Sequence, residues 1–280
     1  MISIDTAPLV WHNGTIAPKE KLNLFFDVNL FLSTNLVETF FLQGTEVMFA
    51  HDTISKIKSL LSIYKFNTKL FNDNSGEFFL NETRRLLIRN NCYKTSRGFL
   101  LITEPLGNAT PNEFIFIEPS PTLFGADKVL KQAIVSSKFL KPDGNVMSLP
   151  TMEHEFRKLV RAEFEYESAD DCIILNQNQC ITESYNGNIF LIDGNRAYTP
   201  SAGTGCTIHL LRGVIIGLLQ DMGIELTESE DLPVDLLFEV REVIIAGTSG
   251  IFSLKGLEYK RYFDITRKKL TERLLALSLT

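Results

Sequence analysis

Three short runs in the second half of the chain decide its fold: DDCIIL at 170–175, CITES at 180–184 and NIFL at 188–191. The first two runs are rich in apolar and β-branched residues and flank a polar segment at 176–179, which predicts a β-hairpin. The third run and the segment 196–198 flank Asp193-Gly194-Asn195, and Asp-Gly is a turn signal. We therefore expect two consecutive hairpins in this part of the chain.

On both sides of these hairpins, the sequence pattern predicts further helices and strands. Upstream, apolar residues recur on one side of a helix expected at 152–166. Downstream, Gly223 is expected to end a helix that starts near His209. A buried strand at 242–246 leads into Gly247-Thr248-Ser249-Gly250, and a last helix is expected at 266–277.

The first half predicts a unit of its own. Its expected elements are strands at 22–31, 36–42, 45–49, 99–103 and 114–118, and helices at 53–64 and 79–90, the first capped by Asp52 or Thr53. Pro119-Ser120-Pro121 and Gly125 indicate a linker. We therefore expect an N-terminal α+β domain at 1–118, an interdomain linker at 119–128 and a second domain at 129–280 that opens with a strand at 129–135.

Composition narrows the classes of partner. The 280 residues are 44% hydrophobic and carry a net charge of −6, which supports a large core and argues against nucleic acid or an anionic membrane as a partner. A small anionic ligand stays compatible, because one phosphate needs only a few local donors. No run is long and apolar enough to span a membrane, and no signal peptide is expected. The four cysteines form no CxxC pair, so we expect free thiols, no metal site and a cytoplasmic protein.

The hairpin runs, followed by Tyr198-Thr199-Pro200, Gly205-Cys206 and a strand ending at Gly247-Thr248, resemble the signature of the class IV aminotransferase family. That family includes branched-chain and D-amino acid aminotransferases and aminodeoxychorismate lyase. The resemblance implies a two-domain α+β fold with a β-barrel-like C-terminal domain, pyridoxal phosphate (PLP) as cofactor and a homodimer. In the first half, 37–39 and the helix from Thr53 match more weakly the family's FET-like strand and HLxRL helix.

The resemblance also assigns cofactor-binding roles. Glu183 aligns with the carboxylate that stabilises the proton on the PLP ring nitrogen, although by itself it also fits a solvated hairpin. Thr248 and Ser249 would bind the phosphate or belong to a plain turn. Lys56 takes the place of the phosphate-binding arginine, with a solvated helix lysine as the alternative. The backbone amides of Leu210 and Leu211 would also face the phosphate.

Four positions depart from the family pattern. The lysine that bonds to the cofactor lies about 32 to 34 residues before the glutamate in the family, and here Pro150 stands in its place. The weak substitutes are Lys141, Lys138 and Lys158. In addition, Lys56 replaces the arginine, and the run Ile208-His209-Leu210-Leu211 stands where the family has a Pro-Gly pair and a threonine.

These departures lead to two hypotheses. The first is a class IV aminotransferase-like protein with a degenerate PLP site, catalytically impaired or inactive, and the four changes together favour it. The alternative is an active PLP-dependent aminotransferase or aminodeoxychorismate lyase that uses a relocated lysine. No residue of the sequence identifies a substrate.

Overall fold

The computed structural model describes residues 6–22, 34–73, 75–104, 110–125, 128–144, 146–149 and 154–277. The chain divides into two compact units, Met1–Leu123 and Phe124–Thr280. The expected strand at 22–31 falls almost wholly outside the described residues, as does the start of the helix expected at 152. That 119–128 acts as an interdomain linker stays a prediction.

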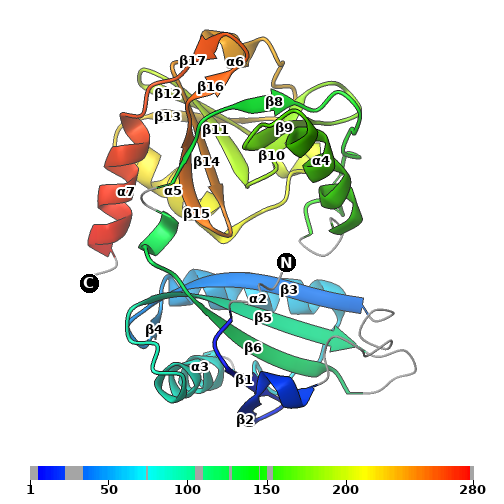
Figure 1. Ribbon diagram of the computed structural model, residues 1–280, viewed down its shortest axis with the longest axis vertical. Helices are drawn as coiled ribbons and strands as arrows, with labels where there is room; N and C mark the ends of the chain where they lie inside the picture. The colour runs from blue at the N-terminus through cyan, green and yellow to red at the C-terminus, as the bar shows by residue number, and fades with distance from the viewer. Residues whose placement is uncertain are drawn as a thin grey trace. The chain divides into compact units, whose positions relative to one another are not determined.

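The N-terminal unit is built on a six-stranded sheet in the order β2-β1-β6-β5-β3-β4 (Figure 1). Its longest pairing joins β3 and β5, from Thr34 opposite Glu104 to Gln43 opposite Thr95. The described strands are β1 (Leu9–His12), β2 (Thr15–Pro18), β3 (Thr34–Gln43), β4 (Glu46–Val47), β5 (Thr95–Glu104) and β6 (Asn112–Pro119). The expected strands at 36–42, 99–103 and 114–118 are therefore confirmed, each extended at its ends.

Two helices accompany this sheet, α2 (Ala50–Tyr64) and α3 (Glu77–Arg89). The expected cap of α2 at Asp52 or Thr53 is wrong, because the helix begins three residues earlier, after Phe49 in a left-handed conformation. Thr53 is buried inside the first turn, and its hydroxyl donates to the carbonyl of Met48 at 3.3 Å instead of capping. Before α3, the Asp73 carboxylate accepts from the amides of Gly76 and Phe78.

The C-terminal unit contains two sheets, in the orders β10-β9-β8-β16-β17 and β13-β12-β11-β14-β15-β7. Side chains from both sheets, among them Ile173, Ile189 and Ile245, form one buried core. This arrangement fits the barrel-like domain that we expected. The described strands are β7 (Val129–Leu130), β8 (Ala133–Val135), β9 (Asp171–Leu175), β10 (Ile181–Ser184), β11 (Asn188–Asp193), β12 (Arg196–Pro200), β13 (Glu225–Ser229), β14 (Glu242–Gly247), β15 (Gly250–Leu254), β16 (Gly256–Leu257) and β17 (Lys260–Arg261).

The helices of this unit lie outside its sheets (Figure 1). Val160 and Phe164 of α4 (His154–Tyr166) pack on Cys172 and Ile174 of β9. The other helices are α5 (Leu210–Asp221), the short α6 (Leu236–Glu239) and α7 (Thr266–Leu277), whose bounds match the prediction. Among the described residues, no helix has the length and apolar composition needed to cross a bilayer.

Both predicted hairpins are confirmed, since β9 pairs with β10 and β11 pairs with β12, each antiparallel. The prediction of a single strand at 129–135 is wrong. This segment forms two short strands, β7 and β8, which belong to different sheets. The amides of Lys131 and Gln132 between them donate to the Asp170 carboxylate, so they are not available to a continuous strand ladder.

Candidate active site

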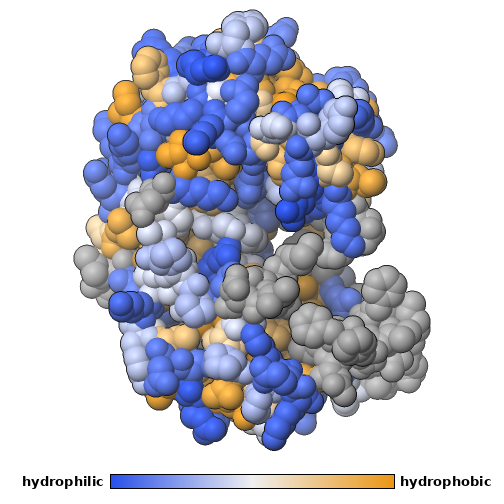
Figure 2. Space-filling view, viewed as in Figure 1, coloured by the Kyte–Doolittle hydropathy of each residue, from blue (hydrophilic) through white to orange (hydrophobic). Residues whose placement is uncertain are grey.

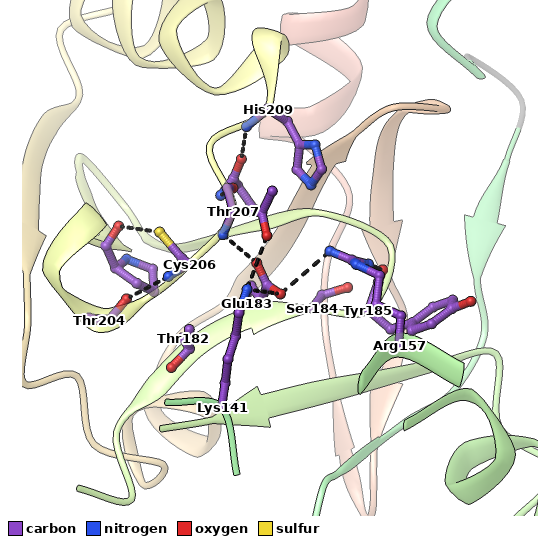
Figure 3. Close-up of polar contacts among 12 residues, drawn as sticks. Lys141, Arg157, Thr182, Glu183, Ser184, Tyr185, Thr204, Cys206, Thr207 and His209 are labelled. Carbon is purple, nitrogen blue, oxygen red and sulfur yellow. Dashed lines mark hydrogen bonds and ion pairs between the residues drawn. The ribbon is translucent and has the colours of Figure 1, made fainter. Parts of the chain in front are cut away.

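Glu183 lies at the centre of a buried group of polar side chains in the C-terminal unit (Figure 3). Its Oε1 accepts a hydrogen bond from the Lys141 amine at 2.9 Å, and its Oε2 accepts one from the backbone amide of Thr207 at 2.7 Å. The Arg157 guanidinium is 3.4 Å from the same Oε1. Glu183 and Lys141 are both 0% exposed. The solvated glutamate that the local sequence also allowed is therefore excluded.

Backbone pairing brings Lys141 to this place. Its amide donates to the carbonyl of Leu175 at 2.8 Å, and its backbone forms a parallel bridge with Asn176, just beyond the end of β9. From there the side chain reaches Glu183, and its amine also donates to the Thr207 hydroxyl at 3.0 Å. Lys141, Glu183 and Thr207 therefore form a closed buried triangle.

Arg157 approaches Glu183 from α4. Its guanidinium donates to the carbonyl of Tyr185 and lies over the Tyr185 ring, 5.5 Å from the ring centre. Its side chain is 20% exposed, whereas the side chains of Glu183 and Lys141 are fully buried. Among these three side chains, that of Arg157 is thus the one that solvent reaches.

These contacts hold the Glu183 carboxylate in its ionised form. Burial alone would raise its pKa, but the charges of Lys141 and Arg157 and the bonds from Lys141 and Thr207 together lower the pKa of Glu183 to about 2. The neighbouring thiol of Cys206 stays protonated at neutral pH, because burial and the charge of Glu183 raise its pKa to about 11. Two basic side chains, those of Lys141 and Arg157, therefore pair with the ionised carboxylate of Glu183.

A second buried carboxylate, Asp171, belongs to β9. It accepts hydrogen bonds from the Ser184 hydroxyl and from the amides of Cys172 and Asn186. Burial raises the pKa of Asp171 to about 6, although these hydrogen bonds oppose the rise. This network fixes the turn that follows β10.

Two of the expected phosphate-binding segments, the turn after β14 and the start of α5, lie near Asn188. Asn188, at the start of β11, donates to the carbonyl of Thr207 at 2.6 Å and accepts from the amide of His209 at 3.1 Å, so it holds the entry to α5. Asn188 also lies opposite Ala246, next to the turn that contains Thr248 and Ser249. Leu210 and Leu211 form the first turn of α5. Thr248 is exposed and Ser249 is half-buried.

The lysines named from the sequence have separate environments. Lys56, in the N-terminal unit, forms an ion pair of 2.7 Å with the buried carboxylate of Glu38, so it is no solvated helix lysine. Lys138 and Lys158 are exposed, and the Lys138 amine lies 5.9 Å from the centre of the Tyr166 ring. Pro150 lies outside the described residues.

Sequence reasoning missed Thr207 and Arg157. Thr207 directly follows the family motif Gly205-Cys206, so its position beside a motif was the available signal. Arg157 is surrounded in the sequence by other charged residues, which favoured a solvated helix face. Only the packing of α4 on β9 reveals that it turns toward Glu183.

Comparison with solved structures gives the same fold. The branched-chain amino acid aminotransferase of Escherichia coli superposes with a TM-score of 0.83 at 20% identity, covering 97% of this chain and 94% of that one. The PLP form of the enzyme from Thermobaculum terrenum gives 0.81 at 15% identity, covering 98% and 94%. A putative 4-amino-4-deoxychorismate lyase from Legionella pneumophila gives 0.77 at 16% identity, covering 90% and 95%. These matches confirm the two-domain α+β fold.

Sequence comparison identifies the family. A putative branched-chain-amino-acid aminotransferase of Methanocaldococcus jannaschii is 26% identical over 176 residues, which are 61% of this chain and 60% of that relative. The chain thus matches about three fifths of this relative's length. The model of the family described as amino-transferase class IV matches residues 65–256, well over half of the chain. On this evidence the protein belongs to the class IV aminotransferase family.

Proposed function

We propose that this protein is a catalytically impaired class IV aminotransferase relative, whose site accepts PLP-type ligands without a covalent bond to lysine. The observation that carries the proposal is the direct contact between the Lys141 amine and the Glu183 carboxylate, 2.9 Å apart and fully buried. Lys141 thus serves as the counter-charge of Glu183.

The shape of the cofactor supports this role for Lys141. In PLP the ring nitrogen and the carbon that bears the aldehyde are on opposite sides of the ring. A carboxylate at the nitrogen therefore stands across the ring from any lysine that bonds to the aldehyde. Lys141 contacts the carboxylate itself, so it would lie on the nitrogen side of a ring bound at Glu183. Lys138 and Lys158 are exposed, and Pro150 has no amine.

The remaining groups fit the other parts of the cofactor. PLP, when bound, supplies an electron sink for reactions at an amino acid's α-carbon. Glu183, ionised, would accept a hydrogen bond from the ring nitrogen. The amides of Leu210 and Leu211 and the hydroxyls of Thr248 and Ser249 would bind the phosphate. The described residues thus fit binding better than catalysis.

The second candidate is an active aminotransferase or lyase that uses Lys141. Its support is that a buried primary amine stands beside the carboxylate of the site, on a side chain with four rotatable methylene groups. For Lys141 to act, it would have to leave Glu183 and become neutral. Because an ion pair stabilises the charged amine, the first candidate is better supported.

A covalent-trapping experiment separates the two candidates. The protein is incubated with PLP, reduced with borohydride and digested, and the peptides are mapped by mass spectrometry. We expect no lysine peptide, that of Lys141 included, to carry a phosphopyridoxyl group above the background level of exposed lysines such as Lys138 and Lys158. Labelling of Lys141 would support the second candidate and overturn the first.

A gain-of-function variant tests whether the site can still hold PLP when a lysine is restored at position 150. Lys56→Arg combined with Pro150→Lys restores two of the family's groups, and we expect it to bind PLP covalently at position 150. The matched control is Lys56→Arg with Pro150→Gln, which adds a long side chain without an amine. Equal labelling of both variants would contradict the proposal.

The assembly and the location are also proposals. Family resemblance supports a homodimer, and the composition supports a cytoplasmic protein whose ligand is a small anion.

A further inference from the structure

The chain leaves the regular pairing of β8 with β9 just before Lys141. The two strands are parallel, and the last pair of their register is Val135 opposite Ile173. If this register continued, Lys138 would lie opposite Asn176. The structure instead has Lys141 opposite Asn176. Three extra residues have therefore left the ladder, and one lysine stands where a regular ladder would put another.

The backbone hydrogen bonds show the same displacement. The amide of Ser136 donates to the carbonyl of Ile173 at 2.8 Å, as in a regular parallel ladder. The next carbonyl on this edge of β9 is that of Leu175, and a regular ladder would give it the amide of Lys138. It accepts from the amide of Lys141 instead, at 2.8 Å. The Lys138 amide thus needs another acceptor.

That acceptor is Glu163 of helix α4, which packs on β9 (Figure 1). Its Oε1 accepts from the amide of Lys138 at 3.2 Å, and from the amide and the hydroxyl of Ser137 at 2.9 and 3.1 Å. Its Oε2 accepts from the Ser136 hydroxyl at 2.8 Å. One carboxylate therefore satisfies four donors of the segment 136–140, which we call the bulge.

Burial and charge suit Glu163 to this task. Its exposed fraction is 6%, and that of Ser136 is 2%. Burial alone would raise the pKa of Glu163, but the hydrogen bonds from the bulge outweigh burial and lower the pKa. The carboxylate is therefore ionised at neutral pH, and an ionised acceptor forms stronger hydrogen bonds than a neutral one. The Phe139 amide also donates to the Ser136 hydroxyl at 3.2 Å, which closes the turn.

We propose that Glu163 is a positioning residue: by holding the bulge, it places Lys141 rather than Lys138 beside Glu183. This inference goes beyond the proposed function and rests on it only for the role of Lys141 as counter-charge. The Lys141 side chain is 0% exposed and its amine is 2.9 Å from the Glu183 carboxylate, whereas Lys138 is exposed. Without the Glu163 carboxylate, the Lys138 amide loses its acceptor, and the regular ladder with Leu175 becomes favourable.

The test measures how fast acetic anhydride acetylates each lysine in the native protein and in Glu163→Gln, with the peptides quantified by mass spectrometry. In the native protein we expect Lys138 to react quickly and Lys141 to be protected. In Glu163→Gln the Lys141 rate should rise by about tenfold, because the bonds that hold the bulge are lost, and the Lys138 rate should fall. Hydrogen exchange of β14, in the other sheet, reports opening of the whole unit and should change much less.

Two further variants serve as controls. Glu165→Gln changes an exposed glutamate of the same helix, which pairs with Arg161, and it should leave both lysine rates unchanged. Ser137→Ala removes a single donor at an exposed position, so it should not disturb the fold. It should change both lysine rates in the same direction as Glu163→Gln, but by less.

Three results in Glu163→Gln would overturn the inference: a Lys141 rate that does not change, a Lys138 rate that does not fall, or an exchange of β14 that rises as much as the acetylation of Lys141. The last result would mean that Glu163 acts only on the stability of the whole unit. Failure of the proposed function is a different result, because it appears as a lysine labelled by PLP in the trapping experiment, whereas acetylation uses no PLP.

Discussion

At the scale of single residues, the chemistry of this protein rests on how Glu183 is held. A buried carboxylate is stable only when its charge is compensated, and here Lys141, Arg157 and the amide of Thr207 compensate it. The sequence identified Glu183 through a motif. It did not reveal the partners, because Lys141 lies 42 residues away and Thr207 approaches from another segment.

Removal of Lys141 should strongly destabilise the fold. Lys141→Met leaves a buried carboxylate with a weaker set of partners, so we expect a loss of about 3–5 kcal/mol in the free energy of unfolding at pH 7. Urea denaturation measures it. The double variant Lys141→Met with Glu183→Gln should lose clearly less, because no uncompensated charge remains. A loss below about 1 kcal/mol for the single variant would show that the pair is not formed.

Asp171 should give stability a distinctive dependence on pH. Its pKa rises from 3.8 to about 6 in the folded protein, so the folded state binds more protons than the unfolded state between these values. Stability from this group is therefore present at low pH and lost as the pH rises through about 6.

Asp171→Asn should remove the loss of stability that occurs as the pH rises through about 6. Between pH 4 and pH 7 we expect the variant to gain stability relative to the native protein by up to about 3 kcal/mol. Denaturation at several pH values measures the difference. Glu183 acts in the opposite direction, because its lowered pKa gives stability that is lost as the pH falls from about 4.5 toward 2. A difference that does not vary with pH would contradict the role of Asp171.

At the scale of elements, apolar periodicity predicted most helices and strands, but not the points where strands change partners. The segment 129–135 is continuous in its pattern, yet Asp170 binds the amides at its middle and divides it. Strand β13 went unpredicted because it is largely exposed and polar, and only its pairing with β12 makes it a strand. Both features depend on contacts distant in the sequence.

Helix α7 is stabilised at its start by a residue from a strand. The Glu242 carboxylate accepts from the amides of Ile265 and Thr266 and from the Thr266 hydroxyl. Glu242→Ala should therefore destabilise the protein by about 1–2 kcal/mol, as loss of a helix cap does. Thermal unfolding measures the effect. Glu239→Ala, at an exposed position of α6, is the control, and equal effects would show that the cap contributes nothing.

At the scale of the whole molecule, the fold could be predicted and the activity could not. The order of motifs from Asp170 to Thr248 was enough to predict the family, and the family match confirms it. Sequence alone left open whether Lys141 reaches the site, because its reach depends on the backbone bridge to Asn176. Only the three-dimensional structure therefore reveals that the Lys141 amine pairs with Glu183.

The family resemblance also predicts a homodimer. We expect the purified protein to have a mass of twice the 31.7 kDa chain, measured by light scattering during gel filtration at micromolar concentration. A constant monomer mass across a hundredfold range of concentration would contradict this prediction.

The central claim is that no lysine of this protein bonds to the cofactor, and the absorbance spectrum of the native protein tests it most directly. After incubation with PLP and removal of the excess, we predict that the protein shows no yellow band and that borohydride fixes no phosphopyridoxyl group to it. A stable yellow band that borohydride abolishes, with the label on a single lysine peptide, would contradict the claim.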